Sequence, residues 1–241
     1  MDPQTAVQKN GTERSLLEQR VNRRKFLLFS GTAASAAVLA AACGREDGAP
    51  GTPNDGVNLG SGDFGILNYA YALEQLEAAF YVQVMATPYA SMPAIEAEFL
   101  KDIRDHEVAH REFFKNALGS NAIQALEVNF SSIDFTYRAS VLGTAKAFED
   151  LGVAAYNGAG KLLQSADYLL LAGKIVSVEA RHAAIIRELI TPNSFADLAS
   201  LAPLGADNTN ALDAAKMPLE VLAIAGTFLK TKINANNLPT S

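Results

Sequence analysis

The sequence predicts an all-α fold, a four-helix bundle with a long crossover between its second and third helices and a short helical extension at its C-terminal end. Alanine and leucine dominate four long stretches that have few internal breakers, which favours helices. Each stretch carries apolar residues at helical spacing. The segment between the second and third stretches, residues 119–135, is longer than a hairpin loop and could carry the chain along a bundle.

Composition and charge narrow the class of protein. The chain has 241 residues, enough for one domain with a hydrophobic core and additional segments. Its net charge of −6 leaves no basic stripe to neutralise phosphates, so we expect no nucleic-acid partner. The single cysteine, Cys43, excludes an intramolecular disulfide, a CxxC redox centre and a rubredoxin-type iron site.

Residues 1–43 predict an export signal. A basic cluster at residues 20–25 precedes an apolar run over residues 26–42, and small residues dominate the end of that run. A basic start, a short apolar core and a small-residue exit are typical of a secretory signal. The pair Arg23-Arg24 resembles a twin-arginine export signal. We therefore expect the protein in the periplasm or cell envelope.

Cys43 leaves three alternatives for how this segment ends. Three alanines precede it, as in the lipobox of bacterial lipoproteins, although Ala40 stands where leucine is usual. The chain would then carry a lipid anchor at Cys43. Signal-peptide cleavage after Ala42 and a membrane-anchoring helix that is not cleaved are the other two. Residues 44–62 are rich in glycine, proline and aspartate and predict a flexible linker.

The bundle is expected over residues 63–192, with residues 193–241 as an extension. The four expected helices cover residues 64–87, 93–118, 136–163 and 165–190. Ser91 is the expected N-cap of the second helix, with Pro93 near its first turn. In the extension, a short apolar helix is expected from Met217, with Pro218 near its start.

Each expected bundle helix has a stripe of apolar or small residues with a glutamate at its middle. Residues three and four apart share a helix face, so each glutamate points inward with its apolar neighbours. The four glutamates are Glu74, Glu107, Glu149 and Glu179. His110 and His182 each follow one of these glutamates by three residues.

The two halves of the bundle repeat this arrangement. The first helix of each half has a glutamate and a tyrosine seven residues later, Glu74 with Tyr81 and Glu149 with Tyr156. The second helix of each half has the Glu-x-x-His pair. The glutamate of the first helix and that of the second are 33 residues apart in one half and 30 residues apart in the other. This pattern predicts an internal repeat of two helical hairpins.

Two single glutamates and two Glu-x-x-His pairs that face inward are the ligand set of di-iron and di-manganese carboxylate bundles. Four carboxylates balance the charge of two divalent cations, whereas without metal each buried carboxylate costs several kcal/mol or holds a proton. Oxygen and imidazole ligands suit iron or manganese, and the spacing does not exclude zinc. Exposed helical charge pairs, or a bundle that no longer binds metal, are the alternatives.

Glu77 complicates the first helix because it lies one turn after Glu74 on the same stripe. We expect Glu74 to be the ligand because only Glu74 has the tyrosine relation that the third helix repeats. Glu77 is alternatively a fifth ligand, a protonated neighbour of the metals, or the ligand in place of Glu74. Tyr81 and Tyr156 are expected either to hydrogen-bond to ligating carboxylates or to be core aromatics.

Two further residues beside the stripes have open roles. Gly152 leaves space either for a small molecule or for close helix packing. His106 lies one residue off its stripe and is expected at the surface or boundary of the bundle.

Residues 64–190 resemble a ferritin-like domain. The stretches LNYAYALEQLEAAFY, DHEVAHREFF and FEDLGVAAYNGA are similar to bacterial exported ferritin-like proteins often called desiccation-related. By motif position, the resemblance implies two divalent metal ions, iron or manganese, held by Glu74, Glu107, His110, Glu149, Glu179 and His182.

Three functions follow as hypotheses. The first is a di-iron or di-manganese oxidoreductase, ferroxidase-like or peroxidase- or catalase-like, with Fe²⁺, O₂ or peroxide as its small-molecule substrate in stress protection. The second is a non-catalytic stress or structural protein of the cell envelope, in which the bundle mediates association and metal is structural or absent. The third, iron storage in a closed shell, fits poorly with the long N-terminal lead, whereas a smaller homo-oligomer is compatible with it.

Overall fold

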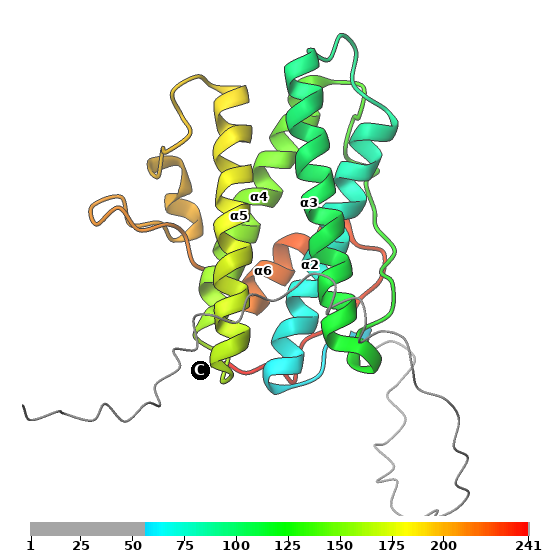
Figure 1. Cartoon of the computed structure of the whole chain (residues 1–241), viewed down its shortest axis with the longest axis vertical. Helices are drawn as coiled ribbons and strands as arrows, with labels where there is room; N and C mark the ends of the chain where they lie inside the picture. Colours follow the sequence, from blue (N-terminus) through cyan, green and yellow to red (C-terminus); the bar gives the residue numbers. More distant parts are fainter. Residues whose placement is uncertain (1–55, 241) are drawn as a thin grey trace, which may run out of the picture. The chain divides into compact units, whose positions relative to one another are not determined.

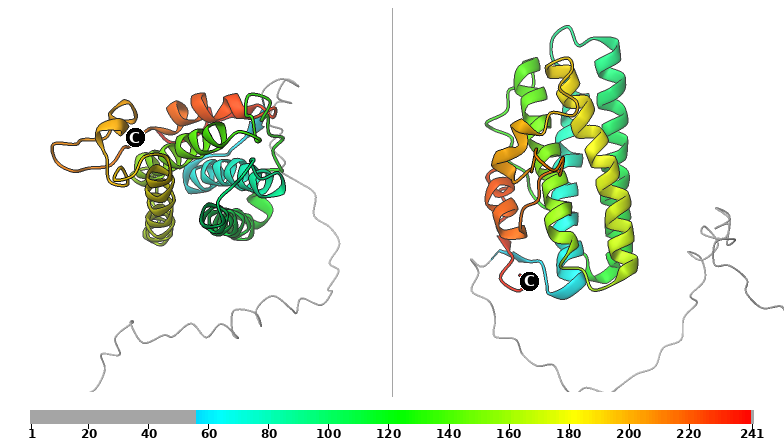
Figure 2. Two further views of the ribbon diagram at one scale, coloured as in Figure 1. Left: turned by 90° about the horizontal axis from the view of Figure 1, so that it is seen from above. Right: turned by 90° about the vertical axis from the view of Figure 1, so that its left-hand side faces the viewer.

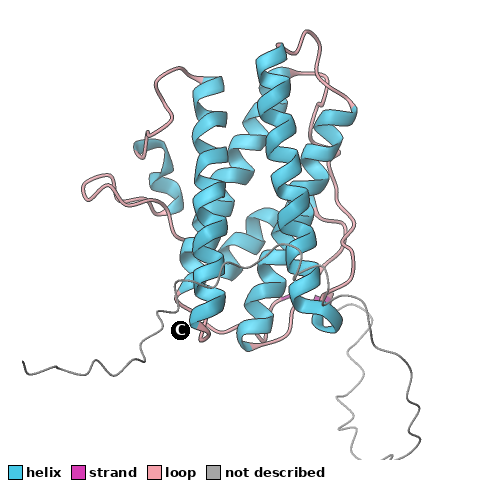
Figure 3. Cartoon of the chain, viewed as in Figure 1, coloured by secondary structure: helices cyan, strands magenta, loops and turns pink. Residues whose placement is uncertain are grey.

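The computed structural model describes residues 56–240 (Figure 1). The predicted signal segment and Cys43 lie outside the described residues. The described part contains four long helices, which Figure 3 distinguishes from the loops: α2 (Gly62–Ala86), α3 (Ala94–Leu118), α4 (Arg138–Gly160) and α5 (Ala166–Ile190). The prediction of an all-α four-helix bundle is confirmed. None of the helices within residues 56–240 is both long enough and apolar enough to cross a lipid bilayer.

The helices form two antiparallel hairpins, α2 with α3 and α4 with α5. At one end of the bundle, Asp63 near the start of α2 accepts hydrogen bonds from the backbone of Gln164 and Ser165, just before α5. At the other end, Arg138 at the start of α4 donates to Glu96 near the start of α3 and to the carbonyl of Leu189 near the end of α5. Helices α2 and α5 therefore run in one direction, and α3 and α4 in the other.

The long crossover is present as predicted. After α3, the chain passes through the short 3₁₀ helix η2 (Gly119–Asn121) and runs along the side of the bundle to the start of α4 (Figure 1). Part of its backbone forms an isolated antiparallel bridge, Val128 with Leu229, and buried side chains of α2 bind other parts. The amide of Asn68 accepts from the backbone of Ile123, and the amide of Gln75 accepts from the backbone of Leu126 at 2.8 Å.

Helix α2 is the central helix of the bundle. It packs against both α3 and α4, and nearly all of its residues from 65 to 81 are buried. A helix that is apolar around most of its circumference is stable only when other elements cover it on several sides. Phe80 anchors this packing, because its ring makes edge-to-face contacts with Tyr81, Phe148 and Phe130.

The C-terminal extension covers the outside of α4. The expected short helix is present as α6 (Pro218–Ala225) and lies along α4 (Figure 2). The 3₁₀ helices η3 (Ala199–Leu204) and η4 (Gly226–Phe228) complete this region. A buried ion pair between Arg187 of α5 and Asp150 of α4 also binds the extension, because the Arg187 guanidinium donates to Ser200.

Two local predictions are wrong. The last part of the predicted linker is structured, because β1 (Val57–Asn58) pairs in parallel with β2 (Ile233–Asn234) and the neighbouring Leu59 is fully buried. Ser91 does not cap α3. It has a φ of 57° in the preceding turn, and Pro93 occupies the cap position.

Candidate metal centre

The structure brings the six predicted ligands together near the middle of the bundle. They form two groups in which the potential ligand atoms all lie within 4.8 Å of one another. Site A consists of Glu74, Glu107, His110 and Glu179. Site B consists of Glu107, Glu149, Glu179 and His182. The two sites share two glutamates, one from α3 and one from α5.

The two shared glutamates reach both sites with different oxygens. Glu107 has Oε1 2.8 Å from His182 Nδ1 in site B and Oε2 3.7 Å from His110 Nδ1 in site A. Glu179 has Oε1 2.9 Å from His110 Nδ1 in site A and Oε2 3.4 Å from His182 Nδ1 in site B. Each of these carboxylates therefore presents one oxygen to each of the two groups.

Each remaining glutamate belongs to one site. Glu74 Oε2 lies 3.4 Å from His110 Nδ1, and Glu149 Oε2 lies 3.5 Å from His182 Nδ1. Glu74 comes from α2 and Glu149 from α4, so the first helix of each hairpin supplies one terminal carboxylate. The arrangement of the two sites thus follows the internal repeat of the sequence.

Several buried polar atoms of this centre make no well-formed hydrogen bond, and their nearest neighbours are the carboxylate oxygens and imidazole nitrogens of the same centre. All four glutamates have zero exposure, and the side chains of His110 and His182 are 14% and 5% exposed. Within residues 56–240, every one of the six presents at least one buried oxygen or nitrogen that makes no hydrogen bond of normal geometry. Such atoms are rare in folded proteins because each forfeits the hydrogen bonds it would make in water. Metal ions would satisfy them, so the residues present fit a metal centre.

Two tyrosines hold the terminal glutamates from the opposite half of the bundle. Tyr81 of α2 donates to Glu149 Oε1 at 2.5 Å, and Tyr156 of α4 donates to Glu74 Oε1. Of the two roles considered for these tyrosines, the structure shows the hydrogen bond to a predicted ligand. In each glutamate the Oε1 atom is occupied by the tyrosine, and the Oε2 atom is left toward the histidine of its site.

Glu77 belongs to neither group of clustered ligands. It is buried, and its carboxylate lies against Gly152, where an added Cβ would come within 3.0 Å of Glu77 Oε1. Glu77 and Gly152 are equivalent positions of the two repeats, each three residues after a terminal glutamate. The structure therefore groups Glu74, rather than Glu77, with the other predicted ligands, and it uses the space at Gly152 for the Glu77 carboxylate.

Burial and mutual repulsion raise the pKa of most of the carboxyls. Burial raises the pKa of Glu149 to about 8, and burial together with neighbouring carboxylates raises the pKa of Glu74 and Glu77 well above the usual value. Burial also acts against charge on Glu107, but contacts with both histidines outweigh it and lower its pKa to about 2.

The histidines balance this negative charge. Burial disfavours the imidazolium form of His110 and His182, but the surrounding carboxylates outweigh burial and raise each pKa to about 12. In the absence of metal, protons therefore supply the positive charge that the glutamates require. Metal ions that bind this centre at neutral pH would have to displace these protons.

One contact of the centre was not anticipated from the sequence. His106 is exposed, as expected, but its Nδ1 lies 2.9 Å from Nε2 of His182. The only signal in the sequence is its position directly before Glu107, one residue away from the inward stripe.

A small apolar cavity of about 30 Å³ lies among the four bundle helices. All four bundle helices contribute to its wall, through residues such as Leu67, Phe114, Ala159 and Ala172. Tyr156 lines the cavity and also donates to Glu74 of site A, so this side chain connects the cavity wall with a predicted ligand.

Comparison with models of protein families identifies a match over the bundle. The model of a protein family described as a ferritin-like domain matches residues 62–192, which contain all four bundle helices and all six clustered residues. No curated protein matches the chain significantly.

Proposed function

The chain belongs to the family of ferritin-like domains, and on this premise we propose that it is an exported protein that binds two iron or manganese ions and performs redox chemistry on Fe²⁺, O₂ or peroxide in stress protection. The observation that carries the proposal is the convergence, in two groups, of buried carboxylate oxygens and imidazole nitrogens from six residues, several of which make no well-formed hydrogen bond. Two groups that share two glutamates suit a pair of ions better than a single ion.

The ligand chemistry and charge favour iron or manganese. The six side chains offer carboxylate oxygens and imidazole nitrogens without sulfur, and four carboxylates neutralise two divalent cations. A bound pair of these ions would supply the electron transfer needed for reaction with O₂ or peroxide.

The protein's own residues would prepare the site for this chemistry. Glu107 and Glu179 hold the two sites at a fixed separation, while Tyr81 and Tyr156 fix the orientation of the terminal carboxylates. Burial excludes bulk water. Glu77, whose pKa burial raises, can hold a proton on its carboxyl beside the centre, where reduction of O₂ or peroxide consumes protons.

The apolar cavity supports O₂ as a substrate. Its volume of about 30 Å³ suits a molecule of a few atoms, and apolar walls favour an apolar molecule over water or an ion. Replacing Ala159 with leucine would fill part of this cavity. We expect Ala159→Leu to slow O₂ consumption while it leaves metal content unchanged.

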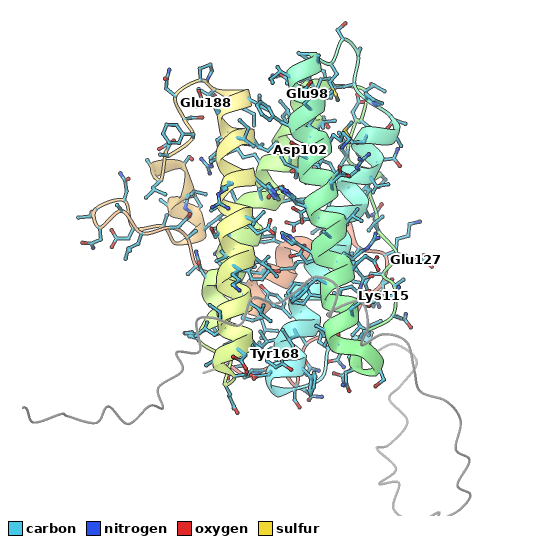
Figure 4. The ribbon with its side chains drawn as sticks, viewed as in Figure 1. Glu98, Asp102, Lys115, Glu127, Tyr168 and Glu188 are labelled. Carbon is cyan, nitrogen blue, oxygen red and sulfur yellow. The ribbon has the colours of Figure 1, made fainter. Side chains whose placement is uncertain are left out.

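Metal analysis is the decisive experiment. Protein purified from its native compartment should contain about two metal ions per chain, and Glu107→Ala should remove binding at both sites because Glu107 is shared. Glu98→Ala is the matched control, since Glu98 lies exposed on the same helix (Figure 4). Full metal content in Glu107→Ala would refute the assignment. Metal-loaded protein that consumes neither O₂ nor peroxide would point instead to the structural role.

Export and lipid anchoring are part of the proposal and rest on the sequence. A twin-arginine route carries folded proteins, so metal could be loaded in the cytoplasm before export. Replacing Arg23 and Arg24 with lysine should retain the protein in the cytoplasm, and Cys43→Ser should release it from the membrane fraction. Export of the double-lysine variant at the wild-type level would contradict the first expectation, and unchanged fractionation of Cys43→Ser the second.

A further inference from the structure

The two sites repeat one another except at one histidine. Nδ1 of His106 lies 2.9 Å from Nε2 of His182, the ligand of site B. The residue directly before the Glu-x-x-His pair of the other half is Val178, whose side chain has neither a donor nor an acceptor. The repeat therefore offers His182 a hydrogen-bond partner that it does not offer His110.

The ring geometry identifies this contact as a hydrogen bond rather than a face-to-face stack. The planes of the two rings differ by 15°, and the ring centroids are 5.1 Å apart. The centroid separation is close to the sum of the 2.9 Å between the nitrogens and the two distances from each nitrogen to the centre of its own ring. The two nitrogens therefore lie nearly on the line that joins the ring centres. The N–H of one ring and the lone pair of the other thus point along one line within both ring planes, as a strong hydrogen bond requires.

We propose that His106 is a positioning residue that sets the tautomer and ring orientation of His182, so that site B binds its metal ion more tightly than site A. The inference rests on the proposed metal binding. Nδ1 of His182 faces the carboxylates, 2.8 Å from Glu107 Oε1, so this nitrogen is the one that would bind metal. It can do so only when the ring proton is on Nε2.

His106 stabilises that tautomer by accepting the Nε2–H of His182 at its own Nδ1. In the opposite arrangement His106 would donate, and the proton of His182 would occupy Nδ1 and block the metal position. A partner for the non-ligating nitrogen typically changes metal affinity by about 10- to 100-fold.

Burial acts in the same direction. The side chain of His182 is 5% exposed and that of His110 is 14% exposed. His110 is therefore more accessible to water than His182. Val178, which stands in the other half where His106 stands in the first, has no polar atom in its side chain to orient the His110 ring. We expect site B to fill first and site A to hold the exchangeable ion.

The test is titration of metal-free protein with Mn²⁺, monitored by calorimetry and by the electron paramagnetic resonance signal of free Mn²⁺. The wild type should show two unequal binding constants. His106→Val, which copies the residue at the equivalent position, should weaken the tighter constant by about 10- to 100-fold. His106→Asn retains an acceptor near the position of Nδ1 and should restore most of the loss.

Two controls assign the effect to site B. Val178→Ala should leave both constants unchanged. In a His110→Ala background, where site B is the better preserved site, His106→Val should weaken the remaining constant by the same factor. If the tighter Mn²⁺ binding constant of His106→Val equals that of the wild type, the proposed role of His106 is wrong, while the proposed metal binding stands. The same holds if His106→Asn binds as weakly as His106→Val. A wild type that binds no Mn²⁺ would overturn the proposed function and this inference with it.

Discussion

The hydroxyl of Tyr81 on α2 donates a 2.5 Å hydrogen bond to Glu149 on α4, so one hairpin positions a predicted metal ligand of the other. The contact occurs in reverse between Tyr156 on α4 and Glu74 on α2. These two crossed hydrogen bonds link the hairpins at their centre, where α2 and α4 are neighbours. The geometry of the centre therefore depends on the correct docking of both halves.

Removing either hydroxyl should weaken metal binding by about 10-fold, because the terminal glutamate loses the donor that orients it. Tyr81→Phe should act on site B through Glu149, and Tyr156→Phe on site A through Glu74. Calorimetric titration with Mn²⁺ measures both effects. Tyr137→Phe is the control, because Tyr137 is exposed. Unchanged binding in both phenylalanine variants would show that the tyrosines serve only the core.

The stability of the metal-free protein should fall as the pH rises from about 5 to 8. Glu149 loses its proton near pH 4.5 in the unfolded chain but near pH 8 in the folded one, because burial raises its pKa. Between these values the folded state binds more protons, so each pH unit lowers the free energy of unfolding by about 1 kcal/mol for this group. His110 and His182 act in the same direction above pH 6.5, since their folded pKa is about 12.

Below pH 4.5 the direction reverses. The folded pKa of Glu107 is about 2, so its contribution to stability is lost as the pH falls from 4.5 through 2. Urea unfolding across the pH range should therefore give a maximum near pH 4 to 5 for metal-free protein. Glu149→Gln should flatten the decline above the maximum. Metal should reverse the trend, because binding releases protons and strengthens with pH. A metal-free protein that becomes more stable from pH 5 to 8 would contradict the assignment of protons to this centre.

Two glycines of α4 should respond oppositely to alanine. An added Cβ at Gly158 would lie 1.8 Å from the carbonyl oxygen of Lys216, so the extension could not keep its place against the helix. We expect Gly158→Ala to lower the free energy of unfolding by about 1–3 kcal/mol. At the exposed Gly143 nothing lies within 4 Å, and Gly143→Ala should raise it by about 1 kcal/mol through helix propensity. Urea unfolding of both variants measures the difference, and equal effects would mean that the extension does not pack tightly on α4.

The bundle and the ligand cluster could be predicted because each depends on spacing along a single helix. The stripe that places Glu107 and His110 on one face follows from 3.6 residues per turn. Each of the four helices has such a stripe with an inward glutamate. The contact of His106 could not be predicted, since it depends on how α3 and α5 are rotated about their axes. The pairing of β1 with β2 was also missed, because two-residue strands have no periodic pattern and the partners are far apart in the sequence.

Glu77 and Gly152 provide a direct test of how the centre accommodates its fifth carboxyl. Alanine at position 152 would bring a Cβ to 3.0 Å from Glu77 Oε1, so the carboxylate would have to shift by a few tenths of an ångström. Without this crowding, the higher helix propensity of alanine over glycine would raise the free energy of unfolding by about 1 kcal/mol. Crowding should cancel most or all of this gain in the wild type, whereas in a Glu77→Ala background Gly152→Ala should raise the free energy of unfolding by about 1 kcal/mol. The coupling energy from the double-mutant cycle, measured by urea unfolding of metal-free protein, should therefore differ from zero by about 1 kcal/mol. A coupling energy near zero would mean that Glu77 does not depend on the space at Gly152, and the reason for a glycine beside Glu149 would then be close helix packing.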